Sequence, residues 1–193
     1  MPGQLCLPGL EFRPSRDVLF FGLLSQTDST AAIIGAADGL RRLHGLNGGL
    51  IGPEHLHVSL HAVGAYDGLP NFIVERAYEA GAMVSTPPFP LVFDRVMSFD
   101  NKQRKRPLVL LPGYDLPRLF TLHHALGQAM KRARVGRNVR PHFAPHMTLL
   151  YDRRMVRERP IEPIRMNVQD FVLVHSLVGQ TRHIELARWV LRG

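Results

Sequence analysis

The chain has a single cysteine, Cys6, among its 193 residues. One thiol can form neither an internal disulfide nor a cluster of thiolate metal ligands, so we expect a protein of the reducing cytoplasm. The longest apolar runs, such as D-V-L-F-F-G-L-L-S, are too short to span a bilayer. The first residues show no basic region followed by an apolar stretch, which predicts the absence of a secretory signal.

Several widespread motifs are also missing. No Walker A loop, G-x-G-x-x-G or G-x-S-x-G occurs, so nucleotide kinases, Rossmann oxidoreductases and α/β-hydrolases have no support. The sequence shows no heptad pattern, tandem repeat of roughly 20–50 residues or low-complexity tract. Hydrophobic residues make up 45% of the chain. This content allows a packed core, and the length suits one domain or two closely packed lobes.

Acidic residues are scarce in one part of the chain. Residues 101–160 hold fourteen Lys or Arg and three Asp or Glu, a charge of +11 in a chain whose net charge is +8. The basic residues cluster at 102–106, 131–140 and 153–159. A single cluster is often only a solvated surface, but three clusters in one part of the chain favour a polyanionic partner, with RNA or a nucleotide first.

One four-residue phrase occurs twice, as H-V-S-L at 57–60 and as H-M-T-L at 146–149. Each copy follows an apolar run, at 18–24 or 108–111, that is typical of a short buried strand. An amphipathic helical pattern and a turn lie between each run and its phrase. The first residue of the run precedes the histidine by 39 residues in one unit and 38 in the other. The chain therefore repeats a strand–helix–strand unit.

The residues around each phrase alternate between apolar and polar, which predicts a strand with one face in the core and one in a polar cleft. The side chains expected in the cleft are His55, His57, Ser59 and His61 from the first strand, and His146, Thr148 and Leu150 from the second. We expect further strands at 89–99, 171–178 and 183–191, and a helix at 71–82.

These elements predict an α+β protein built from two similar lobes. Each lobe would be a mainly antiparallel sheet with helices on one side, and the active-site groove would lie between the lobes. We expect one bilobal domain over residues 1–193, with a pseudo-repeat of roughly 18–100 and 107–191, and a monomer.

Two His-x-Ser/Thr phrases in one groove would supply two imidazoles and two hydroxyls. Imidazole titrates near neutral pH and can act as a base or an acid. Hydroxyl groups can donate hydrogen bonds to the oxygens of an anion. A single His-x-Ser on a strand usually has no catalytic role, but two such phrases at matching places in a repeat favour a catalytic role for their residues. The set suits cleavage of a phosphodiester, with His57 and His146 as the catalytic pair and Ser59 and Thr148 on the phosphate.

The chain resembles the two-histidine (2H) phosphoesterase superfamily, whose signature is two H-x-[ST]-apolar motifs. Within it, the sequence is similar to the RNA 2′,3′-cyclic phosphodiesterases, historically called 2′-5′ RNA ligases. The segments that carry this likeness, besides the two phrases, are F-F-G-L-L at 20–24, P-H-M-T-L at 145–149, F-V-L-V-H-S-L-V-G at 171–179 and L-A-R-W-V-L at 186–191.

The resemblance implies hydrolysis of a 2′,3′-cyclic phosphate end to a 2′-phosphate without a metal or another cofactor, and a reverse 2′-5′ ligation. It also implies that His146 activates the water and His57 protonates the leaving oxygen. Two positions depart from the family pattern. Ser59 replaces the usual threonine, and Tyr151 stands where many members have an arginine five residues after the second motif histidine.

Other side chains are candidates for substrate contact. Phe143 and Tyr151 could stack on a base, as aromatic residues do with single-stranded RNA. Arg104, Arg140 and Arg153 come from the three basic clusters and could contact phosphate. His55, His57 and His61 lack a carboxylate or cysteine at chelating spacing, so we expect no metal site.

Two other interpretations remain open from the sequence. The first keeps the chemistry but changes the substrate to a small cyclic nucleotide such as ADP-ribose 1″,2″-cyclic phosphate. The second is a non-catalytic RNA-binding module whose histidines only contact phosphate; there, the cluster of Lys102, Arg104, Lys105 and Arg106 should matter most. The charge of residues 101–160 favours RNA, because a mononucleotide does not need it.

Overall fold

The computed structural model describes residues 17–100 and 104–193, so Lys102 of the first basic cluster lies outside the described residues. In chain order the elements are β1 (Asp17–Leu24), α1 (Thr27–Leu43), β2 (His57–Tyr66), α2 (Asn71–Ala82), β3 (Phe89–Ser98), β4 (Arg106–Pro112), α3 (Pro117–Arg132), β5 (Met147–Asp152), β6 (Arg159–Val168), β7 (Asp170–Leu177) and β8 (Arg182–Val190). Short 3₁₀ turns lie at Pro53–His55 and Gly136–Asn138. The predicted α+β class is confirmed.

The strands form one antiparallel sheet in the order β6-β3-β4-β5-β2-β1-β7-β8. Its middle is weak, because β2 and β5 are joined by the single pair Val58–Met147, with an isolated bridge between Leu50 and Leu150 beside it. The sheet therefore consists of two four-stranded lobes that meet at the two motif strands. The units β1-α1-β2 and β4-α3-β5 occupy matching positions in these lobes, as the repeat in the sequence predicts.

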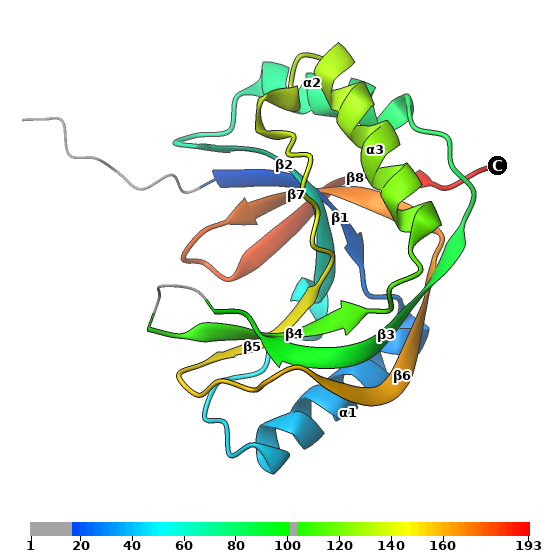
Figure 1. The fold of residues 1–193 in the computed structure, drawn as a ribbon. Coiled ribbons are helices and arrows are strands. Elements are labelled where there is room, and N and C mark those ends of the chain that lie inside the picture. The colour runs from blue at the N-terminus through cyan, green and yellow to red at the C-terminus, as the bar shows by residue number, and fades with distance from the viewer. Residues whose placement is uncertain (1–16, 101–103) are drawn as a thin grey trace, which may run out of the picture.

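The lobes exchange strands after the repeated units. β3 follows the first unit in the chain but pairs with β4 and β6, whereas β7 pairs with β1 and β8. The helices are exchanged in a similar way: α1 packs against β5 and β6, and α3 packs against α2 and contacts β2 (Figure 1). The two lobes are therefore not consecutive parts of the chain, although the sequence repeat divides near residues 100–107.

The helices cover one side of the sheet, where a single large hydrophobic core joins all three helices of the described residues to both lobes. Along β1 and β7 the side chains alternate between this core and the opposite face. On that opposite face Phe20, Val172 and Val174 form a second, small apolar cluster. The open side of the sheet therefore has an apolar floor in one lobe.

The strand β6 was not predicted from the sequence. Its residues, R-P-I-E-P-I-R-M-N-V, include Pro160 and Pro163 and several charged side chains, a composition typical of a loop. β6 lies at an edge of the sheet. Proline is tolerated there because an edge strand leaves one row of N–H groups unpaired.

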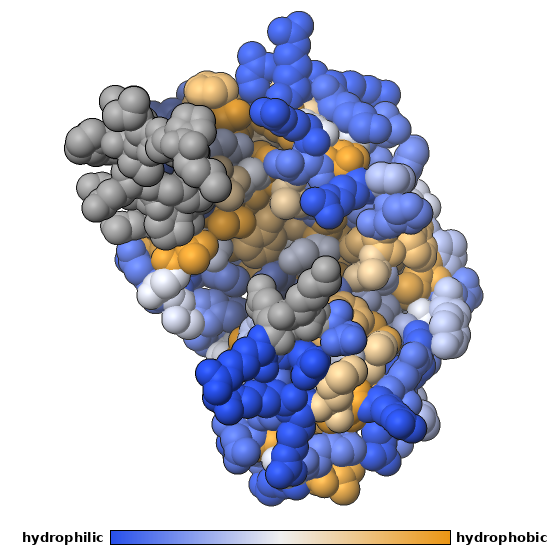
Figure 2. Space-filling view, turned by 60° about the vertical axis from the view of Figure 1, so that its left-hand side comes forward, coloured by the Kyte–Doolittle hydropathy of each residue, from blue (hydrophilic) through white to orange (hydrophobic). Residues whose placement is uncertain are grey.

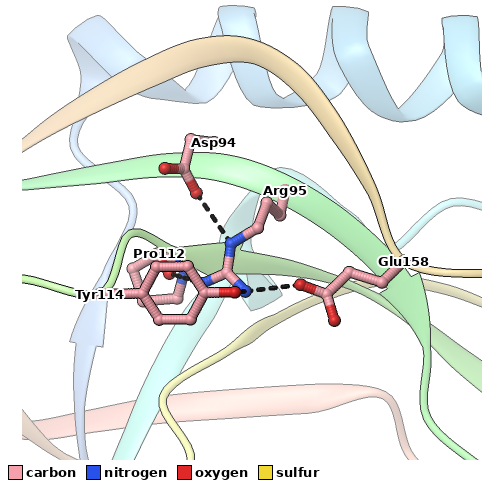
Figure 3. Close-up of polar contacts among 5 residues, drawn as sticks. All are labelled: Asp94, Arg95, Pro112, Tyr114 and Glu158. Atoms are coloured by element: carbon pink, nitrogen blue, oxygen red, sulfur yellow. Dashed lines mark hydrogen bonds and ion pairs between the residues drawn. The ribbon is translucent and has the colours of Figure 1, made fainter.

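A polar cluster around Arg95 joins β3 to the chain before β6 (Figure 3). The Arg95 guanidinium donates to the carboxylate of Glu158 over 2.6 Å and to the carbonyl oxygen of Pro112 over 2.6 Å. Asp94 accepts a third bond over 3.2 Å, and the ring of Tyr114 lies 3.9 Å from the guanidinium carbon. The contacts with Pro112 and Glu158 tie β3 to the end of β4 and to the chain before β6.

No helix within residues 17–100 and 104–193 is both long enough and apolar enough to cross a bilayer. The monomeric state and the cytoplasmic location remain predictions.

Candidate active site

The two phrases lie side by side in the middle of the sheet, because β2 and β5 pair through the second residue of each phrase. Neighbours along antiparallel strands run in opposite order. This register sets His57 opposite Thr148. It likewise sets Ser59 opposite His146. By this register the two histidines occupy diagonally opposite positions across the strand pair.

All four side chains line one cavity of about 750 Å³. The other walls come from residues 50–52, from His55 and Tyr151, and from the β7–β8 hairpin at 176–183. Among the described residues that line the cavity there is no Asp or Glu. Figure 2 looks towards this open side of the molecule and shows mostly hydrophilic residues above and below, with apolar residues exposed between them. The cavity suits an anion with an apolar part.

Both motif histidines are held in the same way. His57 Nδ1 lies 2.7 Å from the carbonyl oxygen of His55, two residues earlier. His146 Nδ1 lies 2.8 Å from the carbonyl oxygen of Ala144, again two residues earlier. A carbonyl oxygen can only accept, so each Nδ1 must carry the proton. The Nε2 atom of each neutral ring is therefore a proton acceptor, and on a protonated ring it becomes a donor.

Aromatic rings pack around both histidines. The ring of Phe20, from the small apolar cluster, lies 4.9 Å from that of His57, and the ring of Phe99 lies 4.8 Å from that of His146. Burial lowers the pKa of His57; the carbonyl contact of His55 opposes part of this effect, and the charges of His146 and His55 lower the pKa further. His57 is therefore neutral in the empty cavity at neutral pH.

The β7–β8 hairpin adds polar residues that sequence reasoning missed. The ring of His183 lies 5.4 Å from that of His57 and 4.5 Å from that of His55. Burial lowers the pKa of His183 to about 4, and the charges of His57 and His55 contribute. Ser176 and Arg182 also line the cavity. No local pattern marks these residues, because only the sheet order β2-β1-β7-β8 brings the hairpin to the site.

The predicted aromatic contacts have different surroundings. Tyr151 lines the cavity and its side chain is 45% exposed, so its ring is available to a ligand. Phe143 lies outside this cavity. One face of its ring is stacked on His123, with centroids 4.0 Å apart and planes 8° apart. That face cannot stack on a base. Binding roles for both rings remain predictions.

The predicted arginines are spread over the surface. Arg140 is exposed and lines a second cavity that adjoins the first. Arg104 and Arg153 are exposed and lie outside the lining of the active-site cavity. Of the three, only Arg140 is therefore placed next to the motif histidines, and any phosphate contact of the other two would lie farther from the reaction.

Each motif strand carries a β-bulge at the leucine that closes its phrase. In β2 the ladder with β1 passes from Ser59 to His61 and leaves out the leucine between them. In β5 the ladder with β4 passes from Thr148 to Leu150 and again leaves out one leucine. The prediction that His61 and Leu150 face the cleft is wrong. An extra residue turns the next side chain to the other face, and both are buried, with 5% and 0% exposure.

His61 instead ends a stack of three rings on the helix side. Its ring lies 3.9 Å from that of His123, which stacks on Phe143, and its Nε2 donates to the carbonyl oxygen of His123 over 2.8 Å. Burial lowers the pKa of His61. Burial also lowers the pKa of His123 to about 4, and the charge of His61 adds to this effect.

The stacked histidines predict a loss of stability in mild acid. Their folded-state pKa values lie below the ordinary value of about 6.5, so the unfolded chain binds more protons between about pH 4 and pH 6.5. The free energy of unfolding should therefore fall as the pH is lowered through this range. Urea unfolding at pH 7 and pH 5 measures the change. The variant His123→Phe keeps the stack but cannot titrate, and it should lose less stability than wild type. An equal loss in both proteins would contradict this account.

A buried carboxylate shapes another wall of the cavity. Asp152 ends β5 and is 5% exposed. Its Oδ2 accepts the backbone N–H groups of Asn47 over 2.6 Å and Gly48 over 2.8 Å, and its Oδ1 accepts that of Arg154 over 2.8 Å. Gly48 has no room for a side chain, because a Cβ there would lie 2.3 Å from the carbonyl oxygen of Tyr151. Asp152 thus holds the loop that leads to residues 50–52.

The described residues include no group of three or more His, Cys, Asp or Glu side chains arranged to hold a metal ion.

The sequence of the chain matches a known protein family. Residues 29–179 match a protein-family model described as the 2′-5′ RNA ligase superfamily. A search of curated proteins found no match.

Several solved structures share the fold. LigT of Escherichia coli in its apo form is 26% identical, with a TM-score of 0.65, and the match covers 92% of this chain and 98% of LigT. TT0787 of Thermus thermophilus is 20% identical over 91% of this chain and 98% of that chain, with a TM-score of 0.74. Usb1 of Kluyveromyces marxianus is 10% identical over 90% and 98% of the two chains, with a TM-score of 0.52. LigT has also been crystallised with 3′-AMP, in a structure 23% identical to this chain.

Proposed function

Because this chain belongs to the 2′-5′ RNA ligase superfamily of two-histidine (2H) phosphoesterases, we propose that it hydrolyses RNA 2′,3′-cyclic phosphate ends to 2′-phosphates without a metal ion. The observation that carries the proposal is the matched pair of histidines. Both Nδ1 atoms bond a carbonyl two residues earlier, and both rings line one cavity with two hydroxyls. The 3′-AMP complex of LigT adds support for a nucleotide 3′ end as the ligand.

The reaction needs one base and one acid. A water oxygen attacks the phosphorus, and the Nε2 atom of one histidine takes the proton of that water. The bond between phosphorus and the 3′ oxygen breaks, and the other histidine donates its Nε2 proton to this oxygen. The products are a 2′-phosphate and a free 3′ hydroxyl, and the two rings have exchanged protonation states. Proton exchange with solvent resets them.

We give His146 the role of base and His57 the role of acid, as the family resemblance implies. The acid must be protonated when the substrate is bound. Burial lowers the pKa of His57 in the empty cavity, but the negative phosphate acts in the opposite direction, since an opposite charge favours the protonated ring. Substrate binding therefore prepares His57 to donate.

Ser59 and Thr148 hold the nonbridging oxygens in this mechanism. Each hydroxyl stands across the strand pair from a histidine, so the two can donate to the phosphate from opposite sides as charge shifts during the reaction. The pair takes the place of a metal ion in stabilising that charge.

Removal of one hydroxyl should slow the reaction without changing the fold. Thr148→Val keeps the shape of the side chain, and we expect kcat to fall roughly 10- to 100-fold. Ser59→Ala should have a similar effect, whereas Ser59→Thr should keep most of the activity. Steady-state kinetics on a cyclic phosphate substrate measures all three. A loss of activity in Ser59→Thr as large as that in Ser59→Ala would argue against the phosphate contact.

The same site could join two RNA ends by a 2′-5′ bond. A 5′ hydroxyl would then attack the cyclic phosphate in place of water, with the histidines again serving as base and acid. Water is present at a far higher concentration than any RNA end, so we propose hydrolysis rather than ligation as the main reaction.

A substrate comparison tests the proposal. Wild-type protein is incubated with EDTA and either a short RNA ending in a 2′,3′-cyclic phosphate or ADP-ribose 1″,2″-cyclic phosphate. We expect a higher kcat/KM for RNA. Turnover of ADP-ribose 1″,2″-cyclic phosphate alone would keep the chemistry but replace the substrate. RNA binding without turnover of either compound would instead support a non-catalytic binding module.

A further inference from the structure

A second cavity, of about 470 Å³, adjoins the active site and shares Ser59 and His146 with it. It lies where β2 and the chain before β5 diverge, since only one residue pair joins the two strands. Asn138 lines this cavity and donates from its Nδ2 to the carbonyl oxygen of Val63 over 2.7 Å. The second cavity therefore forms an exit from the active site towards α3.

A third cavity, of about 350 Å³, continues the second. The two share Arg140 among their lining residues, and the third adds Lys131 from α3. The described residues that line these three linked cavities include no Asp or Glu. The cavity between α1 and β6 differs, because Asp28 and Glu162 line it. A path without carboxylates thus leads from the histidines to the basic segment 131–140.

Within residues 17–100 and 104–193, the cations of this segment are not paired with carboxylates. These cations are Lys131, Arg132, Arg134, Arg137 and Arg140. In the cluster at 102–106, Arg106 does pair with a carboxylate, that of Asp100 over 3.1 Å. Unpaired cations beside an acid-free path are suited to a phosphodiester backbone.

We infer that the RNA strand leading to the reacting end leaves the active site between Ser59 and His146 and lies along Arg140 and Lys131. This inference rests on the proposed function and adds the path of the strand. A cyclic mononucleotide would fill only the first cavity. An oligonucleotide would also contact the basic segment, so the enzyme should prefer a longer RNA chain.

The test compares two substrates and two double variants that remove the same charge. The substrates are 2′,3′-cyclic AMP and a hexaribonucleotide ending in a 2′,3′-cyclic phosphate. Lys131→Ala with Arg140→Ala removes the proposed contacts. Arg118→Ala with Arg165→Ala is the matched control, because these residues line none of the three linked cavities.

We expect the first double variant to raise the KM for the hexanucleotide roughly tenfold relative to the KM for cyclic AMP. The slope of log affinity against log salt for RNA should become less steep by about 1.4, since each phosphate contact on a single strand contributes about 0.7. The control should keep the wild-type ratio of KM values. A similar rise in the control, or no rise in the first double variant, would overturn the inferred path.

The inference and the proposed function can fail separately. If wild type turned over neither substrate, the proposed function would fail. Fluorescence anisotropy with the same RNA carrying a 3′-phosphate would then test the path alone. Weaker binding by the Lys131 and Arg140 double variant than by the control would support the path, and equal binding, or none by wild type, would reject it.

Discussion

Replacing either motif histidine by alanine is expected to lower kcat for an RNA 2′,3′-cyclic phosphate by roughly 100- to 10,000-fold while changing KM little. The register of β2 and β5 places the two rings on one diagonal of the site, and each neutral ring presents Nε2 as a proton acceptor. Each histidine moves one proton in the transition state, so its loss removes an interaction made only there. Steady-state kinetics with EDTA present measures the effect.

The histidine variants need a matched control and a double variant. His44→Ala removes an imidazole at the end of α1, outside the lining of the active-site cavity, and should keep wild-type kcat. The double variant His57→Ala with His146→Ala should be little slower than either single variant, because groups that act as a unit are not additive. A single variant that kept a tenth or more of wild-type kcat would contradict the assignment.

Asp152→Ala should destabilise the fold by about 3 kcal/mol. The change would leave the buried N–H group of Gly48 and the partly buried N–H group of Asn47 without their acceptor, and charged hydrogen bonds of this kind are worth about 1.5–3 kcal/mol each. Urea unfolding at pH 7 measures the difference. Asp67→Ala, at an exposed turn, is the control and should change stability by less than about 0.5 kcal/mol. A loss as small as that of the control would show that the loop does not depend on this carboxylate.

The sign of the pH dependence follows from the same contacts. Burial alone would raise the pKa of Asp152, but the backbone N–H groups of Arg154, Asn47 and Gly48 together lower it below its ordinary value. The contribution of Asp152 to stability is therefore present above the unfolded value of about 3.9 and is lost as the pH falls through the lowered folded value. In Asp152→Ala this acid loss should be smaller. Activity should also fall, since the loop leads to residues 50–52 of the cavity wall.

The sequence repeat predicted the centre of the molecule well. The two strands of each strand–helix–strand unit lie side by side in one lobe, and the helix at Asn71–Ala82 has the predicted bounds. These elements could be predicted because their patterns are local: apolar spacing, cap residues and alternation lie within each segment. The repeat also favoured neighbouring positions for the two phrases, and the pair Val58–Met147 joins their strands.

Features that depend on distant parts of the chain could not be predicted. Simple alternation misplaced His61, because a bulge is set by the ladder with β1 rather than by β2 itself. No local signal places His183 in the site, because the order of β1, β7 and β8 in the sheet decides it. The strand β6 could not be predicted because it contains prolines, which are compatible with a strand only at the edge of a sheet.

The most direct test of the central claim is the identity of the product end. A short RNA ending in a 2′,3′-cyclic phosphate, incubated with wild-type protein and EDTA, is digested to nucleosides and its terminal nucleotide is identified by mass spectrometry and chromatography against standards. The proposed mechanism predicts a terminal 2′-phosphate from wild type and intact cyclic phosphate with His57→Ala or His146→Ala. A terminal 3′-phosphate, or the same product from either variant, would contradict it.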